Sequence, residues 1–202
     1  MIKKEERAEM LHTSEVGRTL RTLLLVAAFA LVPQLAWAQL PSNVANVNVS
    51  AALTESLSVS AGAGPVTFSL VPGAIAPGSA PVAIQTSWIL KPNRIAVTLV
   101  GYFDSLDALT DFGPPAASIN VANVQGRVAT GTPTSFTAFT QSPAVGIGTP
   151  GASLELFSEG IGGTNKQKTR VDNLELQINL TGPVQQPAGI YMGILRIQAI
   201  AN

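Results

Sequence analysis

The chain has no cysteine, and its only histidine is His12. His12 lies in a leader that we expect to be removed, so the mature protein has neither residue type. This excludes a Ser-His-Asp or Cys-His mechanism, and it excludes metal sites built from thiolate or imidazole ligands. Without disulfides, stability has to come from burial and backbone pairing. We expect no cofactor and no enzymatic activity.

Charged residues are also scarce, at 12% of the chain. After residue 38 the chain keeps seven basic and eight acidic residues, which gives a net charge of −1. So few charges form neither a basic stripe for nucleic acid nor a polybasic patch for anionic lipid. The composition therefore predicts that neither is a partner.

The N-terminal residues 1–38 have the pattern of a signal peptide. Arg18 and Arg21 precede the apolar run "LLLVAAFALVPQLA". That run is shorter than the roughly 20 residues of a membrane-spanning helix, and a proline interrupts it. We therefore expect export to the periplasm, the cell surface or the medium, and no stable membrane span after the leader is removed.

The leader ends in a cleavage motif made of small residues. Ala36 and Ala38 form an A-x-A pattern just before Gln39. Cleavage there leaves residues 39–202, a length typical of one domain with one sizeable core. The sequence shows no linker inside that range, so we expect a single domain.

The mature chain alternates apolar and polar residues with a period of two, between turns rich in Gly, Pro and Asn. In "VDNLELQINL", Leu174, Leu176 and Ile178 alternate with polar residues, which is typical of a strand with one buried face. About nine such segments follow one another, with no sustained helical period. The pattern predicts an all-β fold, an immunoglobulin-like antiparallel β-sandwich.

Two strand pairings are suggested by proximity in the sequence. Residues 81–90 and 95–103 flank "KPNR", whose proline and asparagine suit a turn, so they are expected to form a hairpin. The alternation places Ile95, Val97 and Leu99 on the core face of the second strand. Residues 188–200 are expected to pair with 172–180, and either this chain or another copy covers their other edge.

Acidic residues cluster in "FDSLDALTDFG", where Asp104, Asp107 and Asp111 are three and four positions apart. A tight loop could gather them as oxygen ligands for calcium, although the spacing departs from that of a dedicated calcium loop. The same carboxyls could act as an acid and base on a glycoside. Capping or solvation at a strand end is the simpler interpretation, and it is the one we favour.

Aromatic residues raise the alternative of a sugar-binding surface. Trp88 shares its strand face with apolar residues, so we expect it in the core. Tyr102 falls on the opposite face from its apolar neighbours and is the better exposed candidate. The segment "GGTNKQKTR", with Lys166, Lys168 and Arg170, is expected to be a soluble turn, with an anionic polymer as the alternative ligand.

The C-terminal stretch "PAGIYMGILRIQAIA" resembles the closing strand of bacterial exported β-sandwich subunits of the spore-coat-U and fimbrial type. The matching positions are Ala188, Gly189, Tyr191 and Gly193, followed by an alternating apolar strand. The resemblance implies an immunoglobulin-like sandwich and a role in surface structures assembled by a chaperone and usher. The chain departs from that pattern in lacking a cysteine pair and a C-terminal aromatic.

The leader, the strands and the missing catalytic residue types favour an exported bacterial protein with a structural or adhesive role at the cell surface. Its expected partners are other copies of itself, pilus-type subunits and a periplasmic chaperone. A secreted carbohydrate-binding module is the alternative. Residues 47–53 alternate apolar and polar side chains, as a strand donated to a neighbour should. They would serve equally well as the first strand of a closed sandwich.

Overall fold

The computed structural model describes residues 43–62, 64–143, 146–182 and 186–202. The expected signal peptide, with Ala36, Ala38 and Gln39 at its cleavage site, lies outside the described residues. Residues 43–50 form no helix or strand, and their side chains are exposed. The rest forms an all-β domain of antiparallel strands, as predicted, with one short 3-10 turn at Val121–Asn123.

The described residues form eleven strands, where the sequence predicts about nine. Several of them are very short. In chain order they are β1 (Ser56–Ala61), β2 (Ile75–Pro77), β3 (Val82–Ile89), β4 (Ala96–Tyr102), β5 (Asp107–Asp111), β6 (Ala117–Asn120), β7 (Val124–Val128), β8 (Thr137–Ala138), β9 (Ser153–Gly160), β10 (Gln167–Asn179) and β11 (Arg196–Ala201).

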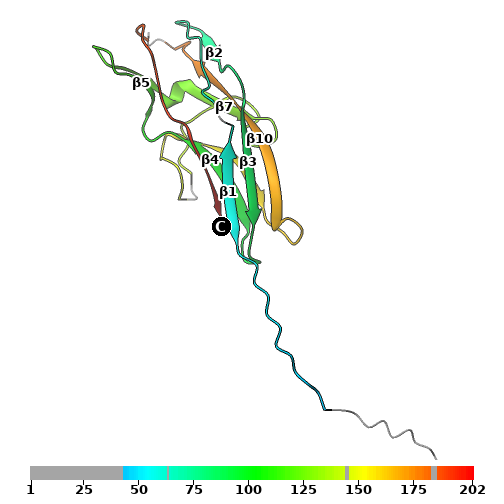
Figure 1. Cartoon of the computed structure of the whole chain (residues 1–202). Helices are drawn as coiled ribbons and strands as arrows, with labels where there is room; N and C mark the ends of the chain where they lie inside the picture. The colour runs from blue at the N-terminus through cyan, green and yellow to red at the C-terminus, as the bar shows by residue number, and fades with distance from the viewer. Residues whose placement is uncertain (1–42, 63, 144–145, 183–185) are drawn as a thin grey trace, which may run out of the picture. The chain divides into compact units, whose positions relative to one another are not determined.

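The strands form two principal sheets in a sandwich-like arrangement (Figure 1). The larger sheet has the order β1-β3-β10-β7-β8, with β2 paired to the far end of β10. The smaller sheet has the order β11-β4-β9. Strands β5 and β6 pair with each other as a separate hairpin. β1 and β11 are therefore the edge strands at which the two sheets meet.

The core lies between the inner faces of the two sheets and is made of aliphatic and aromatic side chains. The larger sheet contributes Ile84 and Trp88 from β3, together with the inward residues of β10. The predicted core face of β10 is confirmed, because Leu174, Leu176 and Ile178 are all buried. Burial of this apolar surface is the main favourable term in folding.

The predicted hairpin of residues 81–90 with 95–103 is wrong. β3 pairs with β1 and β10 in the larger sheet, and β4 pairs with β11 and β9 in the smaller one. The turn between them carries the chain from one sheet to the other, which is why both strands face the core without being neighbours. Ile95 was expected on the core face, but it is 71% exposed because it lies in this crossing, ahead of β4.

The predicted pairing of residues 188–200 with 172–180 is also wrong. β11 pairs with β4, and its register runs from Arg196 opposite Tyr102 to Ala201 opposite Val97. Ile197 and Ala199 of β11 pack against the core. Alternation depends only on which side of a strand is buried, so it is satisfied equally by either partner strand.

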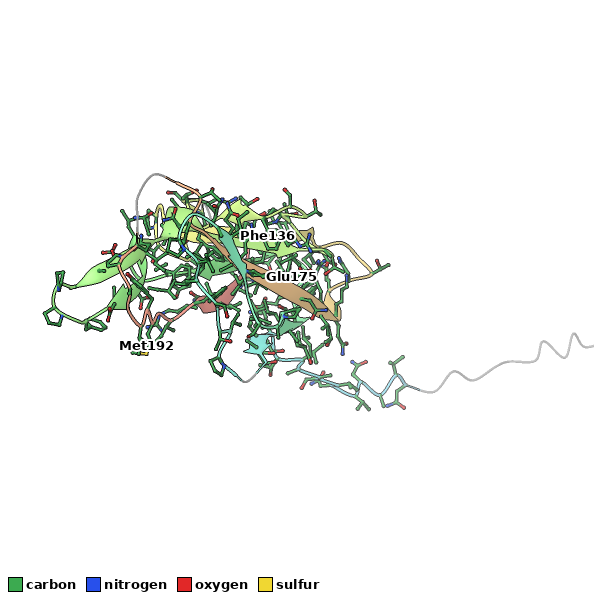
Figure 2. The ribbon with its side chains drawn as sticks, turned by 90° about the horizontal axis from the view of Figure 1, so that it is seen from above. Phe136, Glu175 and Met192 are labelled. Carbon is green, nitrogen blue, oxygen red and sulfur yellow. The ribbon has the colours of Figure 1, made fainter. Side chains whose placement is uncertain are left out.

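The outer face of the larger sheet is polar. On that face the Arg127 guanidinium lies 2.7 Å from a carboxylate oxygen of Glu175 and 4.6 Å from the centre of the Phe136 ring. Phe136 and Glu175 are labelled in Figure 2. Within the part of the chain that the structure describes, no helix has the length and apolar character to cross a membrane.

Candidate functional site

An apolar groove of about 840 Å³ opens in the surface of the domain. One wall is formed by residues 61, 62 and 64–70, from the end of β1 onward, and the other by residues 189–197, which lead into β11. Among the residues that the structure describes, no charged side chain lines it. The lining side chains from the core side are Val82, Phe103, Leu109, Val124, Leu176 and Ile178. A groove of this size and composition suits an apolar segment or ligand.

The wall at residues 190–194 is held by the β5–β6 hairpin. Thr110 and Met192 exchange both backbone hydrogen bonds, at 2.9 and 3.0 Å. Gly193 lies so close to β5 that a Cβ there would collide with the carbonyl oxygen of Ala108. The close approach of the two backbones therefore requires glycine at this position.

The rim of this wall is apolar and faces outward. Ile190, Met192 and Ile194 are 76%, 63% and 69% exposed. Figure 2 shows Met192 at the periphery of the domain, with its sulfur directed away from the core. The two intervening residues, Tyr191 and Gly193, line the groove together with these three. The segment thus presents apolar side chains on both faces, which is unusual for a sheet edge that stays exposed to solvent.

The outer edge of β11 has free backbone groups. Asn202 donates its N–H to the Ala96 carbonyl at 3.0 Å, and Ala96 donates back at 3.4 Å. Hydrogen-bonded and non-hydrogen-bonded pairs alternate in an antiparallel ladder, so Ile197, Ala199 and Ala201 direct their N–H and C=O groups away from β4. No strand among the described residues pairs with this edge.

The outer edge of β1 is open in the same way. Gly62 donates its N–H to Ala83 at 2.7 Å, so the alternate residues Leu57 and Val59 point their backbone groups away from β3. β1 and the dark red β11 run beside each other in opposite directions (Figure 1). The groove begins where β1 ends.

A charged clamp ties these two edges together beyond the groove. Arg94 donates from Nε and Nη2 to the carboxylate of Glu55, at 2.8 and 3.3 Å, and from Nη1 to the carbonyl oxygen of Ala201, at 3.1 Å. Glu55 immediately precedes β1, and Ala201 is the last residue of β11. We call this arrangement the Arg94 clamp. It joins the two sheets through side-chain hydrogen bonds.

The Arg94 clamp is expected to open in acid. The hydrogen bond from Arg94 lowers the pKa of Glu55 below its ordinary value of 4.5. A carboxylate whose pKa is lower in the folded state stabilises that state above its unfolded pKa, and the contribution is lost as the pH falls through the folded pKa. An NMR titration of the Glu55 side chain should therefore give a pKa below 4.5, which moves back toward that value in Arg94→Ala. Equal values in both proteins would contradict the pairing.

The three aspartates that the sequence singled out are not gathered into one site. Asp104 accepts from Arg196 Nε at 2.8 Å, and this contact lowers the pKa of its carboxyl. Asp107 accepts from the Ser118 hydroxyl at 2.7 Å, and Asp111 accepts a backbone N–H two residues further on. In the described ranges no three His, Cys, Asp or Glu residues are placed to hold a metal ion. The capping interpretation fits this geometry.

The two aromatic candidates occupy different environments. Trp88 is buried in the core, as predicted, and donates its indole N–H to the Asn165 carbonyl at 2.9 Å. Tyr102 ends β4 and is partly exposed, with its hydroxyl 3.4 Å from Gln198. It contacts the outer face of β11 and lies outside the lining of the apolar groove.

The segment predicted to be a soluble basic turn contains a buried ion pair. Arg170 donates from Nε to Asp172, which is 1% exposed, at 2.6 Å, and lies over the ring of Phe157. Burial opposes ionisation of Glu159, but hydrogen bonds from Lys168 and its other neighbours outweigh this and lower its pKa. These side chains close the domain at the end where β9 and β10 meet. Arg170, Asp172 and Glu159 are held in place by these contacts.

Sequence reasoning missed both the apolar groove and the Arg94 clamp. The signal for the groove was the outward face of residues 190–200, which is apolar at both ends and less polar than the outward face of 172–180. The clamp left no such signal, because its partners, Glu55 and Ala201, are far from Arg94 in the sequence. Compared with protein-family models, curated proteins and solved structures, the chain matches none of them.

Proposed function

We propose that this protein is an exported structural or adhesive subunit of a bacterial surface assembly, an immunoglobulin-like sandwich completed by a strand from another copy. The observation that carries the proposal is the apolar groove lying beside the free edge of β11. A strand added there would pair its backbone with that edge and bury alternate side chains in the groove. Such β-augmentation is a general way of joining protein chains.

The occupant is the segment of residues 43–53 from a second copy. Val47, Val49 and Leu53 share one face of an extended chain and are each about 80–90% exposed. From Val47 to Leu53 an extended chain spans about 20 Å, the same as the groove wall from Tyr191 to Ile197. The segment therefore matches the groove in length, apolar character and period.

Each copy carries both an acceptor groove and a donor segment, which has a consequence for the assembly. The two surfaces are different patches, so the contact between copies is heterologous. Contacts of this kind continue from copy to copy and form open filaments unless the rotation between subunits closes a ring. A periplasmic chaperone would cover the groove until a second copy fills it, which is the role that the resemblance to fimbrial subunits implies.

The proposal predicts that one apolar residue of the donor segment controls assembly. Val49→Asp places a charge in the apolar groove and is expected to abolish assembly. The matched control is Asn48→Asp, which adds the same charge on the solvent side. Both variants would be made as chains that start at Gln39. Light scattering after size-exclusion chromatography would measure their mass in solution, and electron microscopy would show any filaments. A strictly monomeric unaltered chain, or equal behaviour of the two variants, would contradict the proposal.

A further inference from the structure

We propose that the Arg94 clamp limits how far an added strand extends along β11, by holding the edges of β1 and β11 together beyond Ile197. This inference rests on the proposed function, since it concerns the same groove. It assigns Arg94 a positioning role: the residue sets the length of the acceptor site, and the groove side chains supply the binding.

The lining of the apolar groove supports this limit. On one wall the groove is lined up to Ile197, and Ala199 and Ala201 take no part. On the other it begins at Ala61, so the body of β1 takes no part either. Strands β1 and β11 themselves lie close to each other. The site is thus open at the end where the chain enters β11 and closed at the end where β11 finishes.

The hydrogen bonds of Arg94 explain the closed end. The carbonyl oxygen of Ala201 points away from β4 and would be an acceptor for an added strand, but it accepts from Arg94 Nη1 at 3.1 Å. The guanidinium is held at the same time by two contacts to Glu55, at 2.8 and 3.3 Å. Arginine can bridge a carboxylate and a carbonyl because its donors form a rigid fork. The clamp therefore occupies the last position on the edge.

Glu55 links the clamp to the larger sheet. It lies one residue before β1, and its side chain is only 21% exposed. Lys91 adds a weak contact to the same carboxylate, at 4.0 Å. Since Arg94 holds a residue next to β1 and a residue at the end of β11, β1 cannot separate from β11 without breaking these hydrogen bonds. Opening the clamp would extend the acceptor edge to Ala201.

Disulfide mapping between copies tests the limit, because the chain has no cysteine of its own. Two outward positions report on the two halves of the edge: Ile194→Cys in the open part and Ile200→Cys in the closed part. Each is combined in turn with Asn46→Cys, Asn48→Cys or Ser50→Cys in the donor segment. Oxidation of assembled protein then gives a ladder of linked copies on a non-reducing gel, with an intensity that measures how often the strands meet.

The expected result is a ladder with Ile194→Cys whether or not Arg94 is present. With Ile200→Cys the ladder should be weak, and it should rise about tenfold in Arg94→Ala, the effect expected for losing a hydrogen bond to a charged group. Arg94→Lys keeps the charge but cannot make both contacts, so it should give an intermediate rise and serves if the alanine variant folds poorly. Arg127→Ala, an arginine removed from the outer face of the larger sheet, is the control and should change nothing.

The outcomes separate the two proposals. If Ile194→Cys gives no ladder, with or without Arg94, the proposed function is overturned and this inference with it. A ladder from Ile194→Cys, together with Ile200→Cys ladders of equal strength with and without Arg94, would overturn the inference and leave the function standing.

Discussion

Replacing Phe139 by alanine is expected to lower the free energy of unfolding by about 3–5 kcal/mol. Phe139 is fully buried and meets Phe103 edge to face, with 5.3 Å between the ring centroids. Gly101 and Gly126, from the two facing sheets, lie against opposite edges of its ring; a Cβ on either would come within 3.1–3.2 Å of it. With glycine at both ring edges, the cavity that alanine would leave can be filled only if neighbouring side chains such as Phe103 shift.

Urea unfolding followed by tryptophan fluorescence would measure this loss, because Trp88 belongs to the same core. Phe136→Ala is the matched control, because it also replaces a phenylalanine by alanine. The Phe136 ring packs against Arg127 on the outer face and not in the core. Its loss is expected to be about 1 kcal/mol or less. Similar losses for the two variants would show that Phe139 does not occupy the centre of the core.

Asp172→Asn is expected to cost about 3 kcal/mol, the second large effect on stability. Asp172 is 1% exposed and accepts two hydrogen bonds from Arg170, at 2.6 and 2.8 Å. Asparagine keeps the shape but removes the negative charge, which leaves a partly buried guanidinium without its closest counter-ion. The penalty for an uncompensated buried charge exceeds the net worth of the original pair.

The control for Asp172 is Asp104→Asn, which makes the same chemical change in an exposed ion pair. Asp104 and Arg196 approach to 2.8 Å, but their side chains are 62% and 50% exposed. Exposed pairs contribute at most about 1 kcal/mol, because water and salt screen them. Urea unfolding at neutral pH would compare the two variants. An equal loss in both would mean that the Arg170 pair is solvated in solution.

The buried faces of the strands could be predicted from the sequence, whereas the neighbours of each strand could not. The alternation at Leu174, Leu176 and Ile178 reports directly on contact with the core, because a period of two leaves one face to be buried. Which strands exchange hydrogen bonds depends on how the turns cross between the sheets. "KPNR" has the composition of a hairpin turn and yet connects one sheet to the other, so proximity in the sequence was misleading there.

The candidate site was harder to predict from the sequence than the buried strand faces. Its two walls are far apart in the sequence, and each on its own resembles an ordinary strand; they are residues 61, 62 and 64–70 and residues 189–197. The groove exists because β5 holds one wall while β1 stops short on the other side. The exposed alternating segment at Val47, Val49 and Leu53 was visible in the sequence, but its role depends on a groove that only the folded domain provides.

The pairing of β11 with β4 also determines when the smaller sheet can form during folding. The two strands come from positions about a hundred residues apart, and loops of that length close slowly compared with local hairpins. In the larger sheet β1 and β3 are close in the sequence, so this pair is able to form early. Until β11 arrives, the edge of β4 that β11 will cover stays open, and this is the stage at which the chain would aggregate. Refolding should therefore show a slow phase that reports on β4 and β11, whether or not a second copy is present.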